Sequence, residues 1–256
     1  MGTRGTCGVR IDGQDKLSYN HFDSYPDGLG VEILYDLHTM ISEWGIEKLR
    51  ERARALRQVD SNSTPTAEEI KALSGFADLS VSRRTPDEWY CLLRELQGRL
   101  MDTLVVGMSI EGNNFINDSL FCEWGYIVNL DENVLEVYTG FQDAPHNKGR
   151  YASATDGNES YPGGSTYYPC AFLVSFSLDN LPTEEEFIIG INRAPFESTE
   201  DMVLNHLKDY GDLTAEDAAS RFGIDNIGEV IEALVEVGNH DIRFDGETYE
   251  LLSSDD

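Results

Sequence analysis

The stretch Cys122–Phe141 reads CEWGYIVNLDENVLEVYTGF, and it decides the fold of the chain. Two runs rich in β-branched and aromatic residues, 122–129 and 134–141, flank the polar segment 130–133. Such runs on either side of a short polar segment predict a β-hairpin. Side chains alternate between the two faces of a strand, so we expect one face of this hairpin to pack on a core through Tyr126, Val128, Leu130, Leu135 and Val137.

Further strands are expected on both sides of this hairpin. Residues Tyr168–Leu178 form another β-type run, and Phe187–Asn192 is a less marked one. At the N-terminus, a strand over Thr3–Asp12, a Gly13-Gln14 turn and a second strand reaching Phe22 predict an opening hairpin. The segment 142–167 is polar and rich in Gly, Asn and Ser, which indicates a long surface loop.

Helical periodicity begins after the opening hairpin. Apolar residues recur every three or four positions over Val31–Trp44, and a second helical stretch follows over Ile46–Val59. Thr66 with Glu69 forms a capping-box pattern before a short helix that reaches Gly75. Thr85 followed by Pro86 reads as a helix start, so a helix is expected over Pro86–Leu104. Residues 1–194 therefore predict an α+β domain with a mainly antiparallel sheet and inserted helices.

A second, smaller domain is expected over residues 195–256, with its boundary in Ala194–Ser198. A helix over Thr199–Tyr210, with Met202, Val203, His206 and Leu207 inward, precedes two shorter helices that start near Thr214 and Asn226. The segment 241–251 then alternates around an Asp-Gly turn, which is typical of a β-hairpin. Three helices followed by a hairpin predict a winged helix-turn-helix domain.

The chain is strongly acidic, with 47 acidic against 19 basic residues, a formal charge of −28 and only five lysines. The acidic residues are spread over the chain and 40% of residues are apolar, so a disordered acidic protein is not expected. An even acidic surface with few lysines indicates adaptation to molar salt, where screening makes self-repulsion tolerable. We expect a halophilic protein from a haloarchaeal cell or from a virus that infects one; an unusually acidic mesophilic protein is the alternative.

The four cysteines, Cys7, Cys91, Cys122 and Cys170, are widely spaced. They form no CxxC pair, so the sequence predicts neither a zinc site nor a disulfide framework, and it favours reduced, buried thiols in a cytosol. No apolar leader and no stretch of about 18 apolar residues is present, so we expect no membrane association. The expected location is the cytoplasm, or a virus particle within a haloarchaeal host.

The charge of the tail bears on its partner. Residues 197–256 hold 17 acidic against three basic residues (Lys208, Arg221 and Arg243), a net charge of −14. Because phosphate binding depends on several Lys or Arg contacts, this tail favours protein contacts or self-association over DNA binding. A separate basic segment contains five cations between Lys48 and Arg57. We interpret it as a helix whose charges pair with nearby carboxylates rather than as a nucleic-acid contact.

The loop Tyr19–Gly30, YNHFDSYPDGLG, is the candidate functional site. Loops dense in reactive groups and held between regular elements often carry function. His21 and Asp23 lie two apart and are the candidate catalytic pair, for acid–base chemistry. Cys7 on the neighbouring strand is a conceivable nucleophile, and the candidate binding residues are Arg4, Asn20, Tyr25 and Asp27.

The same loop has a purely structural explanation. Ser24-Tyr25-Pro26-Asp27-Gly28 is good turn chemistry, and Asp27 or Ser24 could cap the following helix. No metal site is predicted, no cofactor is indicated, and no phosphate-binding loop, GxSxG elbow or HExxH helix occurs. An N-terminal nucleophile has little support, because removal of Met1 would expose Gly2.

Several motifs together resemble an uncharacterised protein family that occurs in fungi, bacteria and some viruses of prokaryotes. They are MGTRG at the start, YNHFDSYPDGLG at 19–30, CEWGYIVNLD at 122–131, LEVYTGFQ at 135–142, YYPC at 167–170 and Leu181-Pro182. The resemblance covers about residues 1–190 and implies no activity and no catalytic residues. The winged-helix tail resembles an addition typical of haloarchaeal proteins.

Three functions remain open at this point. The first is a module that binds a ligand or a protein through the loop Tyr19–Gly30, with a tail for protein contacts. The second is a hydrolase-like enzyme using His21 and Asp23, with Arg4 as an anion anchor, which requires all three side chains to converge in a pocket. The third is a virion or assembly component or a DNA-binding regulator. A mere turn would instead have Asp23 and Asp27 occupied by backbone donors.

Overall fold

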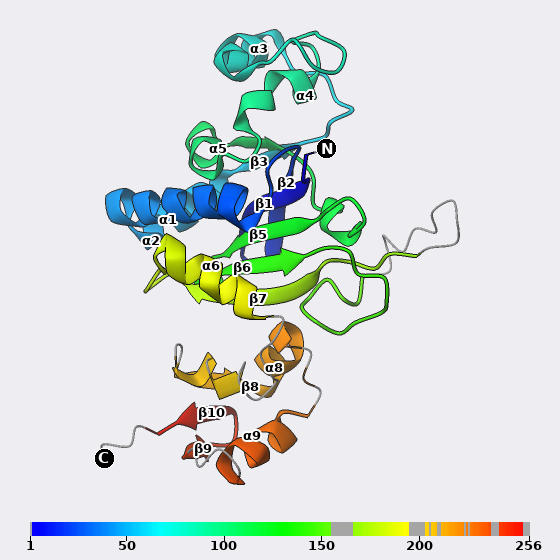
Figure 1. Cartoon of the computed structure of the whole chain (residues 1–256). Coiled ribbons are helices and arrows are strands. Elements are labelled where there is room, and N and C mark those ends of the chain that lie inside the picture. The colour runs from blue at the N-terminus through cyan, green and yellow to red at the C-terminus, as the bar shows by residue number, and fades with distance from the viewer. Residues whose placement is uncertain are drawn as a thin grey trace.

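The computed structural model of the chain describes residues 2–154, 166–194, 203–204, 206–208, 211–222, 224, 226–236 and 241–252 (Figure 1). A five-stranded sheet lies at its centre, in the order β2-β1-β5-β6-β7. The strands are β1 (Gly5–Ile11), β2 (Gln14–Asn20), β5 (Trp124–Asn129), β6 (Val134–Thr139) and β7 (Ala171–Ser177). The α+β class is confirmed.

The sheet is mixed. β1 pairs with β5 in parallel, whereas the β1–β2, β5–β6 and β6–β7 pairs are antiparallel. The parallel pair arises because the helices and loops after β2 carry the chain away from the sheet and return it beside β1 (Figure 1). The predicted central hairpin is present, and the five side chains expected on its core face are all buried; Tyr126 pairs with Val137 and Val128 with Leu135.

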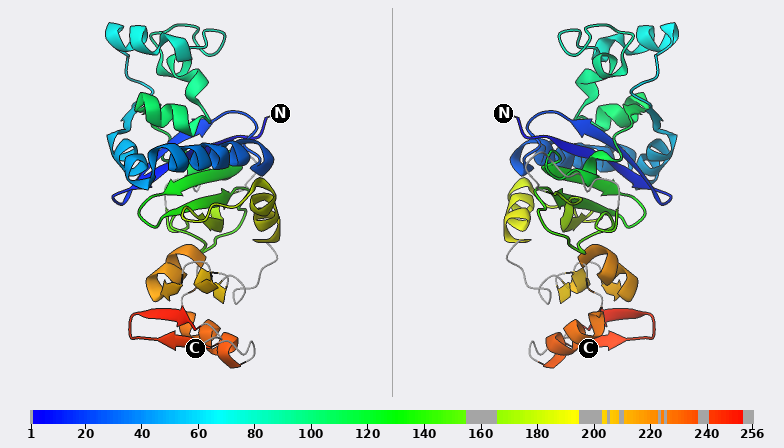
Figure 2. Two further views of the ribbon diagram at one scale, coloured as in Figure 1. Left: turned by 90° about the vertical axis from the view of Figure 1, so that its left-hand side faces the viewer. Right: turned by 90° about the vertical axis from the view of Figure 1, so that its right-hand side faces the viewer.

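Three helices cover one face of the sheet: α1 (Val31–Trp44), α2 (Ile46–Ala55) and α6 (Glu184–Arg193) (Figures 1 and 2). The main core lies between them and the sheet and holds the fully buried side chains of Ile33, Leu37, Met40, Leu49, Tyr126, Val128, Leu135, Val137 and Phe187. Burial of this many large apolar side chains is the principal stabilising contribution of the domain.

The predicted strand Phe187–Asn192 is wrong, because these residues lie inside α6. Thr183 caps the helix by accepting a hydrogen bond from the Glu186 amide, and Glu186 reaches back to the Thr183 amide at 2.8 Å. Phe187 and Ile191 are both buried, at the i, i+4 spacing of one helix face. A short apolar run does not by itself distinguish a strand from a buried helix.

A smaller unit is inserted between α2 and β5. It contains the parallel strands β3 (Arg57–Val59) and β4 (Met108–Ile110) and the helices α3 (Ala67–Leu73), α4 (Trp89–Leu92) and α5 (Leu100–Val106). Its own core is formed by Val59, Leu73, Trp89, Leu92, Leu93 and Leu96. The capping box of Thr66 and Glu69 is confirmed at the start of α3.

The predicted helix Pro86–Leu104 is wrong in its extent. Glu88 has an extended backbone (φ −114°, ψ 124°), so α4 begins only at Trp89. α4 ends at Leu92, and the extended Gln97 (ψ 127°) and the left-handed Gly98 (φ +78°) separate it from α5, which begins at Leu100. This break forms a sharp bend in the segment 89–99, which lies next to the loop after β2.

The opposite face of the sheet carries a buried ionic cluster centred on Glu136 of β6, which is 3% exposed. Arg150 binds the Glu136 carboxylate and donates to Asp15 at 3.1 Å, and Asn129 donates to Glu136 at 2.8 Å. Tyr151 is also buried and donates to Asp15 at 2.9 Å. Arg150 and Tyr151 therefore hold their part of the predicted surface loop 142–167 against the sheet. Residues 155–165 of this loop lie outside the described residues.

The C-terminal segment has a separate core. It contains β8 (Asp212–Thr214), α8 (Ala215–Phe222), α9 (Ile227–Glu236), β9 (Ile242–Phe244) and β10 (Thr248–Leu251), with the sheet order β8-β10-β9. The predicted hairpin over 241–251 is confirmed as the β9–β10 pair. Of the predicted helix Thr199–Tyr210, residues 203–204 and 206–208 are helical; Met202 and most of the boundary Ala194–Ser198 lie outside the described residues. Across the described residues, no helix combines the length and apolarity that a membrane span requires.

Candidate ligand-binding site

The candidate loop is fixed to the sheet at both of its ends. β2 ends at Asn20, so His21 and Asp23 lie beyond the strand, and the alternation expected to place them on one side does not apply. The buried Ser24 donates its amide to the Thr3 carbonyl at 3.2 Å and accepts the Tyr126 hydroxyl at 3.0 Å. The left-handed Asp23 (φ +53°) then reverses the chain, and its carbonyl accepts the Leu29 amide at 2.9 Å.

Asn20 holds the tight bend of this loop. Its side-chain amide donates to the Phe22 carbonyl at 2.5 Å and to the Ser24 hydroxyl at 2.9 Å. Its Oδ1 atom lies 2.9 Å from the position that a Cβ on Gly98 would occupy. A side chain at position 98 would therefore require Asn20 to move out of its hydrogen bonds with the loop.

His21 is paired with Tyr19 rather than with Asp23. The Tyr19 hydroxyl lies 2.5 Å from Nδ1 of His21. Burial lowers the pKa of His21, and the positive charges of Arg94 and Arg4 lower it further; burial raises the pKa of Tyr19. Both directions favour a protonated tyrosine and a neutral imidazole, so the two side chains share a hydrogen bond between uncharged groups.

A polar cavity of about 250 Å³ lies beside the loop. Four loop residues line it, namely Asn20, Phe22, Asp23 and Leu29, and the bend from Arg94 to Arg99 forms another part of its wall. The remaining lining residues are Glu32 and Asp78. The cavity therefore joins three regions of the sequence: the loop, the start of α1 and the inserted unit.

The other predicted site residues do not line this cavity. Arg4 lies over the ring of Phe121, 5.2 Å from its centre, Tyr25 is 48% exposed, and neither His21 nor Asp27 contributes to the cavity wall. Within the described residues, the carboxylates of Asp23 and Asp27 accept no backbone hydrogen bond. Of the three side chains that the hydrolase requires, Asp23 lines this cavity and His21 and Arg4 do not, and the two carboxylates are not occupied by backbone donors within the described residues.

Arg94 is the distinctive group of the cavity. Its guanidinium carbon lies 5.6 Å from the centre of the Phe22 ring and 5.8 Å from that of Tyr90, and Nη1 donates to Gln97 Oε1 at 2.5 Å. Among the described side chains, no carboxylate approaches Arg94 within ion-pair distance. Two aromatic rings and an amide thus hold this cation in place and leave donors for a further group.

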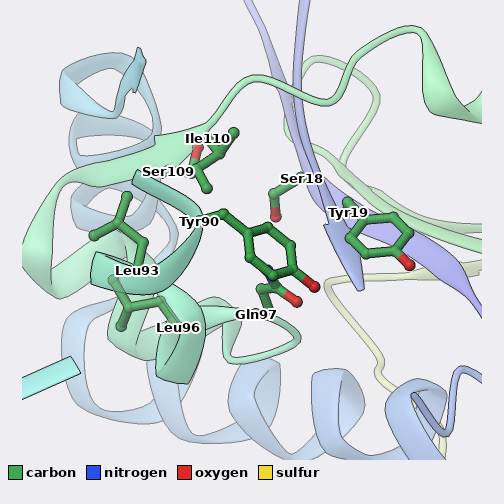
Figure 3. Close-up of a pocket in the computed structure, with 8 residues that line it drawn as sticks. All are labelled: Ser18, Tyr19, Tyr90, Leu93, Leu96, Gln97, Ser109 and Ile110. Atoms are coloured by element: carbon green, nitrogen blue, oxygen red, sulfur yellow. The ribbon is translucent and has the colours of Figure 1, made fainter. Parts of the chain in front are cut away.

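A second, smaller cavity of about 50 Å³ adjoins the first, because Gln97 lines both. Figure 3 shows Leu93 and Leu96 on the helical side of this cavity and Tyr19 on the strand side, with the ring of Tyr90 between them. Ser18, Ser109 and Ile110 complete the lining. Most of this lining is apolar or aromatic.

The remaining candidate groups are occupied. Cys7 is 2% exposed, and burial raises the pKa of its thiol to about 12, so it is not a thiolate near neutral pH. In the part of the chain that the structure describes, no group of three or more His, Cys, Asp or Glu side chains could hold a metal ion. In the basic segment, Lys48 pairs with Glu51 at 2.8 Å and Arg54 with Asp12 at 2.9 Å, as expected for a helix with paired charges.

The sequence indicated the loop but not its partners. The predicted helix Pro86–Leu104 contains Tyr90, Leu93, Arg94 and Gln97, and the sequence pattern distinguishes none of them as a site residue. The available signal was Gly98, a helix-breaking residue inside an otherwise periodic pattern. A comparison of the chain with protein-family models, with curated proteins and with solved structures gives no match.

Proposed function

We propose that the protein is a binding module whose polar cavity takes a small ligand with an anionic group. The observation that carries this proposal is the position of Arg94 in the cavity wall, against the rings of Phe22 and Tyr90 and with no carboxylate of the described residues within ion-pair distance. A guanidinium fixed in this way loses little conformational freedom on binding and offers a planar pair of donors to a carboxylate or phosphate. In a chain of formal charge −28, such an arrangement favours recognition over surface ion pairing.

A hydrolase that uses His21 and Asp23 is the alternative, and it has less support. Nδ1 of His21 is occupied by the Tyr19 hydroxyl, and His21 does not line the cavity. A general base needs to reach the proton that it removes, directly or through one water molecule. For this reason we assign His21 to the support of the loop rather than to a chemical step.

We further propose that the C-terminal segment is a winged-helix domain that mediates protein contacts or self-association. The order helix, β8, α8, α9 and the β9–β10 hairpin supports the first part, and the net charge of −14 over 197–256 disfavours DNA. The test is a pull-down in molar KCl with the full chain and with a chain lacking 197–256. Retention of every partner by the shortened chain would contradict this role.

The binding function is tested by thermal unfolding in the presence of a fixed panel of carboxylates, phosphates, nucleotides and amino acids. A compound present at about 100 times its Kd stabilises the folded state by about 2.7 kcal/mol, which raises the Tm of a chain of this size by about 5–10 °C. We expect at least one compound to do so for the wild type and for Arg193→Gln, an exposed control, but not for Arg94→Gln. The proposal fails if no compound shifts the Tm, or if Arg94→Gln responds like the wild type.

A further inference from the structure

The larger cavity presents both signs of charge. Arg94 and Arg99 line it together with the carboxylates of Asp23, Glu32, Asp78 and Glu95. Arg99 also has Asp102 as an ion-pair partner at 3.6 Å, which leaves Arg94 as the cation best placed to bind a ligand. A purely anionic ligand would bind at Arg94 against four carboxylates, whereas a ligand that also carries a positive charge would satisfy both.

The smaller cavity provides an apolar region beside the positive and negative charges of the larger one. It shares Gln97 with the charged cavity, and Leu93, Leu96, Ile110 and the rings of Tyr19 and Tyr90 contribute its apolar lining (Figure 3). Its volume of about 50 Å³ favours a short branched alkyl group over a bulkier indole. Tyr90 also connects the two cavities, since its ring lines the smaller one and lies under the Arg94 guanidinium.

We infer that the ligand is a free α-amino acid with a branched aliphatic side chain. One carbon atom of such a molecule carries a carboxylate, an ammonium group and an apolar side chain. The carboxylate binds Arg94, the ammonium group lies among the carboxylates of the larger cavity, and the side chain enters the smaller one. This inference rests on the proposed binding function and specifies its ligand class.

The probes are L-leucine and three analogues that each lack one group, measured by isothermal titration calorimetry at one fixed KCl concentration. They are 4-methylpentanoate without the ammonium group, 3-methylbutylamine without the carboxylate, and glycine without the side chain. We expect L-leucine to bind and each analogue to bind at least about tenfold more weakly, the effect of a lost interaction of about 1.4 kcal/mol. L-tryptophan is expected to bind more weakly than L-leucine because of its size.

The variant Arg94→Gln tests whether Arg94 binds the carboxylate of the amino acid, and Arg193→Gln is its matched control. We expect Arg94→Gln to weaken the binding of L-leucine at least about tenfold, so that its Kd equals that of 3-methylbutylamine. Arg193→Gln should leave both Kd values unchanged. Because this comparison uses two ligands on one variant, it does not depend on whether the substitution also alters stability.

Two outcomes separate this inference from the proposed function. If 4-methylpentanoate binds as tightly as L-leucine, or if only other compounds of the panel bind in an Arg94-dependent manner, the amino-acid inference is overturned and the binding function stands. If neither L-leucine nor any panel compound depends on Arg94, both are overturned.

Discussion

The guanidinium of Arg94 lies 5.6 Å from the centre of the Phe22 ring, which joins the loop after β2 to the bend after α4. Phe22 is 52% exposed despite this contact, so the pair lies at the surface, where a ligand can reach it. The polar cavity exists because these two segments, distant in sequence, approach each other here.

The approach of the two segments depends on Gly98. A Cβ at this position would lie 2.9 Å from Asn20 Oδ1, and the residue that carries it would have to adopt φ +78°. We expect Gly98→Ala to lower the free energy of unfolding by more than the roughly 1–2 kcal/mol of the left-handed conformation alone. Gly107→Ala is the control, because Gly107 has φ +75° with nothing within 4 Å. Equal losses in urea denaturation would show that the close approach at Gly98 contributes nothing.

The pKa of His21 is expected to respond to the positive charge of Arg94. Burial and the charges of Arg94 and Arg4 lower the pKa of His21, so NMR titration is expected to give a pKa below the ordinary value of about 6.5. Arg94→Gln should raise this pKa towards the ordinary value, and the distant Arg193→Gln should not. An unchanged His21 pKa in Arg94→Gln would mean that the two groups do not interact.

The same shift has a consequence for stability. Because the pKa of His21 is lowered in the folded protein, the unfolded chain binds the proton more readily. The contribution of His21 to stability is therefore present above about pH 6.5 and is lost as the pH falls through its lowered pKa.

The ionic cluster on the opposite face is expected to be important for stability. Arg150→Leu would leave the Glu136 carboxylate, 3% exposed, without its cation, at a cost of about 3 kcal/mol. The control Arg54→Leu breaks the exposed pair with Asp12 and should cost much less. In urea denaturation, the double variant Glu136→Gln, Arg150→Leu should recover part of the loss, since no charge is then buried. Equal effects of Arg150→Leu and Arg54→Leu would contradict this account.

The acidic composition predicts a strong salt dependence of stability. Raising KCl from about 0.1 M to about 2 M shortens the Debye length from about 10 Å to below 3 Å and reduces the self-repulsion of a chain with net charge −28. We expect the Tm to rise over this range. The control is 1 M sucrose, which favours the folded state without screening charge. A Tm that is unchanged or falls with KCl would contradict halophilic adaptation.

Local patterns were sufficient for some elements. The hairpin 122–141 could be predicted with its buried face because its side chains alternate, and α3 because Thr66 and Glu69 form a capping box. Other elements were wrong for identifiable reasons. Phe187–Asn192 is too short a run to separate strand from helix, and the helix predicted over Pro86–Leu104 contains Gly98, a helix-breaking residue. The helix predicted over Ile46–Val59 ends at Ala55, because Arg57–Val59 pairs with β4 as a strand.

The site was only half predictable. The loop Tyr19–Gly30 could be found by its composition, but its closeness to Arg94 results from tertiary packing that no local pattern encodes. The buried Glu136 and Arg150 pair is a further example, since each looks like an ordinary surface residue in the sequence. Both cases involve charges whose role depends on segments far apart in the chain.

The most direct test of the Arg94 site is to locate the binding. The panel compound that raises the Tm most would be titrated into ¹⁵N-labelled protein while the amide signals of the full chain are followed. We predict shifts that saturate for Asn20, Gln97 and Gly98 and are absent for Leu213 and Tyr249 in the C-terminal segment. Saturating shifts confined to other parts of the chain, with Asn20, Gln97 and Gly98 unmoved, would contradict the account.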